Sequence, residues 1–322
     1  MNYKIRKISG DASFREFYRV KKNNKTSIIV FAKKEKLKNL IVYCVVNDIL
    51  NKHKIISPKL IKNDYQDNMI EITDLGEKSF YDHIKNKKNK FHDYKKLIEV
   101  IFKFQKIKLK KSYSFGKNKI KFTKYSISYL HKESDLFFDW YLKFLIQKKN
   151  LNKIKKVLRQ ELNNIYKKLY FKNNFFVHCD FHASNIMLSD KKIGVIDSQD
   201  AKIGNPLYDI ASLIDDVRIK LSKNLQNNLF NYYMLKSKFK IKEKPYFKND
   251  FDILSVQRNL KILGIFARLY KRDKKSNYLK YLPYTWLLLE RRMKNPIFNK
   301  LNILLKKYLP LEKLKKIKKY DN

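Results

Sequence analysis

A polar segment near the middle of the chain carries residues suited to phosphate chemistry. Asp180 and Asn185 stand five positions apart, and Asp197 follows a further apolar stretch. Two oxygen ligands for Mg²⁺ and a separate carboxylate that accepts a hydroxyl proton are the minimum set for phosphoryl transfer. The residue types and their spacing therefore indicate that chemistry, provided that the fold brings the three side chains to one point.

Aspartate is concentrated around this segment. Seven aspartates and no glutamate lie between residues 180 and 216, about twice what an even spread of the 30 acidic residues would place there. Because neighbouring carboxylates repel one another, such a cluster in a basic chain favours a bound divalent cation. Aspartates and asparagines that only form turns are the alternative interpretation.

Short strands are expected to position these side chains. Residues 175–177 and 186–188 are apolar and flank the polar loop, and residues 192–196 end at Asp197. We expect a β-hairpin across the loop, followed by one more turn that brings Asp197 back to it.

The rest of the chain reads as an α+β fold with a small sheet-containing part and a large helical part. A helix over 36–50 has apolar residues at Leu37, Leu40, Ile41 and Cys44, the spacing of one buried face. The predicted strands are 3–8, 14–21, 26–32, 59–62 and 68–74. The other predicted helices are 93–105, 125–146, 151–170, 250–270 and 278–293, with a solvated terminal helix over 306–320. We expect two lobes, an N-terminal nucleotide-binding lobe over 1–74 and a catalytic and substrate lobe over 75–322.

The motif His178-x-Asp180-x-x-x-x-Asn185, followed by Ile196-Asp197, resembles the catalytic and metal-binding loops of the aminoglycoside phosphotransferase and choline kinase family. Gly204-Asn205-Pro206-Leu207-Tyr208-Asp209 is similar to the turn and helix start that follow in that family. Gly10-Asp11-Ala12-Ser13-Phe14-Arg15 and Gln199-Asp200-Ala201 most resemble the bacterial N-acetylmuramate/N-acetylglucosamine anomeric kinases of cell-wall recycling. The resemblance implies a bilobal protein-kinase-like fold, with a five-stranded N-lobe carrying one helix and a mainly helical C-lobe.

The resemblance also implies roles for single residues. Asp180 is the base for the sugar hydroxyl, and Asn185 and Asp197 hold Mg²⁺ on the ATP phosphates. His178 supports the loop from within and Asp209 braces its backbone. The expected nucleotide contacts are Ala12, Ser13, Arg15, Lys33, Glu71 and Thr73. Asp200, Asp216 and Arg218 are candidates for the sugar substrate.

One part of the family pattern is missing. The third strand, residues 26–32, has no lysine to grip the α- and β-phosphates, and the helix over 36–50 has no glutamate to pair with one. Arg15, Arg19 or Lys33 are the candidates to supply that charge.

Composition limits the other interpretations. The 322 residues include 74 Lys plus Arg, and the net charge is +44, but 44% of the chain is hydrophobic, which excludes a disordered polycation. Lysine is spread along the chain and arginine is scarce, which favours background composition over nucleic-acid binding. Cys44 and Cys179 form no disulfide framework. The longest apolar run, residues 40–46, is too short to span a bilayer. We therefore expect a cytoplasmic protein without nucleic acid, of open oligomeric state.

Two alternatives remain at this point. An aminoglycoside or choline-type kinase would use the same catalytic loop with a site for a cationic substrate. A non-catalytic kinase-shaped module that binds nucleic acid or membrane is favoured by the missing lysine and opposed by the intact set of Asp180, Asn185 and Asp197.

Overall fold

The computed structural model describes residues 3–8, 15–23, 25–32, 37–144, 146, 148–189, 192–309 and 312. The chain divides into two compact units. Unit 1 comprises residues 1–123 and 175–203, and unit 2 comprises residues 124–174 and 204–322. The lobe boundary expected after residue 74 falls within unit 1. Asp180, Asn185 and Asp197 consequently share a compact unit with the N-terminal sheet.

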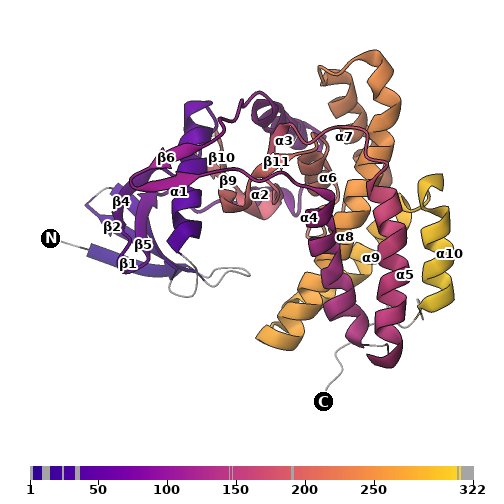
Figure 1. Ribbon diagram of the computed structural model, residues 1–322. Helices are drawn as coiled ribbons and strands as arrows, with labels where there is room; N and C mark the ends of the chain where they lie inside the picture. The colour runs from indigo at the N-terminus through magenta and orange to yellow at the C-terminus, as the bar shows by residue number, and fades with distance from the viewer. Residues whose placement is uncertain are drawn as a thin grey trace. The chain divides into compact units, whose positions relative to one another are not determined.

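Unit 1 contains a five-stranded antiparallel sheet with the strand order β1-β2-β3-β5-β4 (Figure 1). The strands are β1 (Tyr3–Ile8), β2 (Glu16–Lys22), β3 (Lys25–Phe31), β4 (Leu60–Asp64) and β5 (Met69–Thr73). Side chains alternate between the two faces of a strand, so Ile28 and Val30 of β3 and Ile70 and Ile72 of β5 are buried together. All five predicted strands are confirmed.

The buried face of the sheet packs against α1 (Leu37–Lys52), the helix predicted over 36–50. Leu40, Ile41 and Cys44 of the predicted apolar stripe are buried. The stripe continues into Asn47, a polar residue that is only 2% exposed. A buried amide on an otherwise apolar face must find hydrogen-bond partners, and these lead to the site described below.

The remainder of unit 1 is built from short elements. They are α2 (Phe80–Ile84), α3 (Phe91–Gln105), the hairpin β6 (Tyr113–Phe115) and β7 (Asn118–Ile120), then β8 (Phe175–Val177), β9 (Ile186–Ser189), β10 (Lys192–Val195) and β11 (Lys202–Gly204). The expected hairpin of 175–177 with 186–188 is wrong, because β8 pairs with β11 and β9 pairs with β10. The connection from β8 to β9 contains a 3₁₀ turn, η3 (Ala183–Asn185), and forms a wide loop instead of a hairpin turn.

Unit 2 is helical and is organised around the 30-residue helix α8 (Lys244–Asp273). This helix packs against α4 (Ile127–Leu136), α6 (Tyr208–Ile214) and α9 (Leu282–Arg292), and α5 (Lys148–Tyr166) packs against α4 and α10 (Asn299–Tyr308) (Figure 1). α7 (Lys223–Lys236) packs against α6. Short 3₁₀ segments precede α8 at Ile241–Glu243, α9 at Ser276–Tyr281 and α10 at Pro296–Phe298.

The helix predicted over 125–146 is not continuous. The α-helix ends at Leu136, a π-helical turn follows at Phe137–Tyr141, and a 3₁₀ turn covers Leu142–Phe144. α- and π-helices both place residues i and i+4 on nearly the same side, so apolar spacing does not distinguish them. Phe137, Phe138 and Tyr141 are core residues, and Tyr141 accepts a hydrogen bond from Trp286 Nε1 (2.7 Å).

Of the terminal helix expected over 306–320, the structure describes α10, which ends at Tyr308, and the last ten residues lie outside the described part. Across the described ranges, no helix combines the length and apolarity that crossing a membrane requires.

Candidate active site

The loop between β8 and β9 is held from within by His178. This side chain is fully buried and its ring stacks on Phe104. Its Nε2–H donates to the carbonyl of Ile196 (3.1 Å), and its Nδ1 accepts from the backbone N–H of Asp180 (3.3 Å). Burial lowers the pKa of His178 to about 4, so the ring is neutral near pH 7, as these two hydrogen bonds require. One imidazole thus joins the backbone of Asp180 to the residue that precedes Asp197.

Asp180, His182 and Asn185 form a hydrogen-bonded cluster at the loop surface. The Oδ2 atom of Asp180 accepts from Asn185 Nδ2 (3.0 Å) and lies 3.2 Å from His182 Nε2. Asn185 Nδ2 also donates to the Asp180 carbonyl (3.0 Å). The Asp180 side chain is 39% exposed, whereas that of His182 is buried. The carboxylate is therefore fixed in orientation and still reachable by a substrate.

Left-handed backbone occurs directly before the cluster and again at Asp197. Cys179, directly before Asp180, has φ 71°, and Asp197 has φ 63°. Left-handed backbone is uncommon for residues other than glycine and persists only where the surrounding contacts enforce it. At Cys179 the buried side chain supplies such contacts, which agrees with a packing role for this thiol.

Asp197 lies two residues after the end of β10 and is partly buried. Desolvation, followed by the nearby negative charge of Asp180, raises the pKa of its carboxyl group. Its Oδ1 atom accepts a hydrogen bond from Gln199 Nε2 (2.8 Å). Two mutually repelling carboxylates, one of them poorly solvated, form an arrangement that a cation would stabilise.

The residues present fit Mg²⁺ in their donor chemistry. Within the described residues, the hydrogen bonds of the Asn185 amide all involve Nδ2 and none uses its oxygen, Oδ1. Those residues contain no group of three acidic, histidine or cysteine side chains that could enclose a metal. Mg²⁺ is commonly held by one or two protein oxygens together with water and phosphate oxygens. Asn185 Oδ1 and the Asp197 carboxylate match that smaller donor set.

Several polar residues beside Asp197 form contacts that the sequence motifs do not indicate. The Ser198 hydroxyl donates to Asn47 Oδ1 of α1 (2.6 Å), and Gln199 Oε1 accepts from Arg15 (3.1 Å). Tyr43, one helical turn before Asn47, lies under the Arg15 guanidinium. In the sequence, the feature that could have indicated these contacts is Asn47, a polar residue on the apolar face of a predicted helix.

Only some of the residues expected to contact the nucleotide lie within the part of the chain that the structure describes. Glu71 and Thr73 lie in β5, between β3 and β4, where Glu71 accepts from the Ser27 hydroxyl (2.6 Å) and Thr73 Oγ1 accepts from the Lys59 backbone N–H (2.9 Å). Arg15 is buried and directly precedes β2. The predicted contacts Ala12, Ser13 and Lys33 lie outside the described residues.

The candidates for substrate contacts are divided between the units. Asp200 is exposed in unit 1, directly after Gln199. Asp216 and Arg218 belong to unit 2. So does Asp209, the residue expected to brace the catalytic loop, which is buried in the first turn of α6. Asp216 is also buried and accepts from the backbone N–H of Arg218 (3.0 Å).

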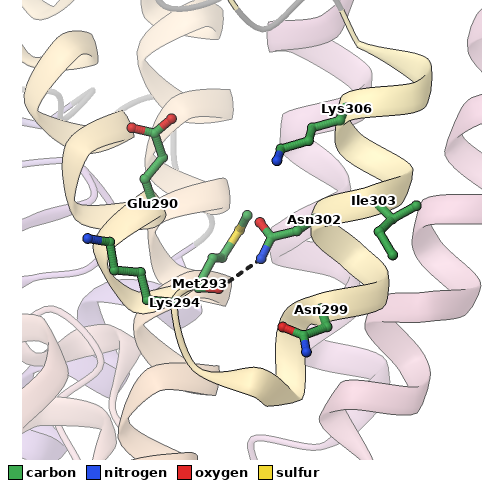
Figure 2. Close-up of a pocket in the computed structure, with 7 residues that line it drawn as sticks. All are labelled: Glu290, Met293, Lys294, Asn299, Asn302, Ile303 and Lys306. Atoms are coloured by element: carbon green, nitrogen blue, oxygen red, sulfur yellow. Dashed lines mark hydrogen bonds between the residues drawn. The ribbon is translucent and has the colours of Figure 1, made fainter.

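A separate hollow lies in unit 2 between the end of α9 and α10 (Figure 2). Its floor includes a hydrogen bond from Asn302 Nδ2 to the Met293 carbonyl (2.8 Å). None of the residues to which the sequence assigns a role lines it. The lining residues are Glu290, Met293, Lys294, Asn299, Asn302, Ile303 and Lys306.

Curated relatives carry a common name. A protein of Pseudomonas aeruginosa named N-acetylmuramate/N-acetylglucosamine kinase is 26% identical over 290 residues, which cover 88% of this chain and 81% of the relative. A protein of the same name from Neisseria meningitidis serogroup B is 25% identical over 279 residues, covering 85% and 81% of the two chains.

Solved structures share the fold at low sequence identity. Aminoglycoside phosphotransferase APH(4)-Ia, in a thermostable apo form, has a TM-score of 0.63 at 11% identity, with 89% of this chain and 94% of that chain covered. Plasmodium vivax ethanolamine kinase has a TM-score of 0.61 at 15% identity, with 92% and 84% covered. These similarities confirm the expected kinase-like fold. The family model described as phosphotransferase enzyme family matches residues 4–239, and the chain therefore belongs to that family.

Proposed function

We propose that this protein is an ATP- and Mg²⁺-dependent kinase that phosphorylates the anomeric hydroxyl of an N-acetylated amino sugar, N-acetylmuramate or N-acetylglucosamine, in cytoplasmic cell-wall recycling. The observation that carries the proposal is the cluster of Asp180 and Asn185, in which one hydrogen bond orients the carboxylate and leaves the amide oxygen for a metal. The sugar follows from the names of the curated relatives. ATP follows from solved family members that hold ADP, such as aminoglycoside phosphotransferase APH(2'')-Ib.

Asp180 acts on the sugar in this proposal. The hydroxyl oxygen forms a bond to the γ-phosphorus while the bond from that phosphorus to the β–γ bridging oxygen breaks, and the hydroxyl proton passes to Asp180. Asn185 Nδ2 holds the accepting oxygen in place, and His182 contacts the same oxygen. A carboxylate is a weak base, so it takes the proton late, after most of the bond to phosphorus has formed.

Asn185 and Asp197 hold Mg²⁺, which when bound neutralises phosphate charge during transfer. His178 keeps the two halves of this arrangement at a fixed spacing through Ile196 and the Asp180 backbone. The roles proposed for the remaining residues are support by Asp209, sugar contacts by Asp200, Asp216 and Arg218, and nucleotide contacts by Ala12, Ser13, Arg15, Lys33, Glu71 and Thr73, in a nucleotide-binding lobe over residues 1–74.

The experiment is Mg²⁺-dependent ATP consumption with N-acetylmuramate, N-acetylglucosamine, choline and kanamycin as acceptors, with ³¹P NMR of the product. We expect turnover with an N-acetylated sugar, an anomeric phosphate signal, and loss of turnover in excess EDTA. Asp180→Asn lowers kcat about 10²- to 10⁴-fold, the range of a general base. Asp67→Asn, an exposed aspartate, is the matched control and retains wild-type turnover.

Turnover only with choline or kanamycin would refute the sugar assignment and leave the kinase chemistry in place. Wild-type activity in Asp180→Asn would refute the role of that residue. Absence of turnover with every acceptor, together with salt-dependent binding to nucleic acid, would favour a non-catalytic binding module.

A further inference from the structure

Neutral side-chain hydrogen bonds connect α1 to the residues beside Asp197. The family pattern has an ion pair between the third strand and this helix instead. β3 runs from Lys25 to Phe31 without a lysine in its buried half, and α1 contains no glutamate. In place of that pair, Asn47 of α1 accepts from the Ser198 hydroxyl (2.6 Å). This contact anchors the residue next to Asp197 to the helix, but it supplies no positive charge for phosphate.

Arg15 brings a positive charge to the same place. The residue is 7% exposed, and its NH1 donates to Gln199 Oε1 (3.1 Å). The guanidinium carbon lies 5.7 Å from the centroid of the Tyr43 ring, a cation–π distance. Side chains from α1 and from the segment after β10 thus meet at the Arg15 guanidinium.

Gln199 links this guanidinium to the proposed metal ligand. Its Oε1 accepts from Arg15, while its Nε2 donates to Asp197 Oδ1 (2.8 Å). The acceptor is a neutral amide, and this hydrogen bond fixes the orientation of the guanidinium relative to Gln199. A planar guanidinium donates several parallel N–H groups, which suits the oxygens of a phosphate. The arrangement therefore presents an oriented cation beside the site where Mg²⁺ and phosphate are proposed to bind.

Arg19 of β2 is differently placed. Its Nε and NH2 donate to the Asp74 carboxylate (2.6 and 3.0 Å), and NH2 also donates to the Gly76 carbonyl (2.8 Å). Glu77 contacts the same guanidinium. Two carboxylates neutralise Arg19, so its contribution is to hold the segment that follows β5.

We propose that Arg15 is the phosphate-binding cation of this protein and that Gln199 is the positioning residue that couples it to Asp197, in place of the strand-lysine and helix-glutamate pair. This inference rests on the proposed function for its ligand, a nucleoside triphosphate. In this arrangement, Tyr43 and Asn47 of α1 support the same cation, Tyr43 by its contact with Arg15 and Asn47 by its hydrogen bond with Ser198.

The test is nucleotide binding by calorimetry at saturating Mg²⁺, in the Asp180→Asn background so that no turnover occurs. The probes are ATP, ADP and adenosine, and the variants are Arg15→Met and Arg15→Lys. A lost charge-assisted hydrogen bond to phosphate predicts that Arg15→Met weakens ATP binding ten- to hundredfold. Adenosine, which has no phosphate, is bound within twofold of the parent protein. Arg15→Lys keeps the positive charge, so its affinity for ATP should lie between those of the parent protein and Arg15→Met.

Arg6→Met is the matched control, because Arg6 is an exposed arginine on the neighbouring strand β1, and it leaves ATP and adenosine binding unchanged. Equal ATP affinity in Arg15→Met and its parent would overturn the inference and leave the proposed function standing. Equal weakening of ATP and adenosine would also overturn it, because it would show that Arg15 only maintains the fold. A parent protein that binds no nucleotide would refute the proposed function itself.

If Arg15→Met does not fold, the variant Gln199→Glu tests the same inference. This substitution keeps the hydrogen-bond acceptor for Arg15 and adds a negative charge that neutralises the guanidinium. We expect at least fivefold weaker ATP binding, with adenosine binding preserved. ATP affinity equal to that of the parent would overturn the inference.

Discussion

The buried imidazole of His178 predicts a loss of stability at mildly acidic pH that one substitution removes. In the folded protein its Nδ1 accepts the backbone N–H of Asp180 and its Nε2–H donates to Ile196. A proton on Nδ1 would abolish the first hydrogen bond and place a charge in a fully buried position. The imidazole of His178 is therefore neutral in the folded protein.

The pKa values give the magnitude and sign. The pKa of His178 falls from 6.5 in the unfolded chain to about 4 in the folded protein. Between these values the unfolded state binds more protons, so stability falls as the pH falls from 6.5 towards 4 and is fully present above 6.5. Integrated from pH 7.5 to pH 5, this one group costs about 2 kcal/mol of unfolding free energy. The cost reaches about 3 kcal/mol below pH 4.

The assay is urea unfolding of the wild type, His178→Gln and His92→Gln between pH 7.5 and pH 5. Glutamine does not titrate, so the stability advantage of the wild type over His178→Gln should shrink by about 2 kcal/mol across this range. Carboxyl groups whose pKa burial raises, such as that of Asp250, titrate in all three proteins and cancel in the comparison. His92 is exposed, so His92→Gln should follow the wild type. An unchanged difference between the wild type and His178→Gln from pH 7.5 to pH 5 would show that His178 is not held neutral by the fold.

Two further predictions concern unit 2. Arg292 donates to both oxygens of the buried Asp215 carboxylate (2.6 and 2.8 Å), so Arg292→Met leaves an uncompensated charge and should lower the unfolding free energy by about 3–5 kcal/mol in urea titrations. Adding Asp215→Asn should recover most of that loss, and a double variant no more stable than Arg292→Met would contradict this explanation. A Cβ on Gly264 would lie 2.3 Å from the backbone carbon of Leu136, so Gly264→Ala must separate α8 from α4. We expect a loss of about 1–3 kcal/mol, read as a lower Tm by calorimetry, and an unchanged Tm would show that the helices do not cross this closely.

Local patterns were sufficient for the strands of the five-stranded sheet, for α1 and for the candidate chemistry. The β-branched and aromatic residues of 26–32 predicted the strand β3, because strand propensity is a property of the residues themselves. The spacing of Asp180 and Asn185 needed only a short loop, and their side chains meet within five residues of chain. Interactions of this range are encoded by neighbouring residues and can be read without the fold.

Pairings between distant segments were not predictable in this way. The β8–β9 hairpin was expected from proximity in sequence, whereas the pairing of β8 with β11 depends on strands more than twenty residues apart. The π-helical turn after Leu136 was missed because its apolar spacing matches that of an α-helix.

The sequence by itself determined the family, the two types of secondary structure and the carboxylates available for phosphoryl transfer, because each depends on residue identity and short spacing. Only the tertiary structure decided which arginine stands beside Asp197. Arg15 and Arg19 are four residues apart and chemically identical, yet one is paired with Asp74 and the other is hydrogen-bonded to Gln199, 184 positions along the chain. The difference arises from packing, which alone determines the partners that a buried charge finds.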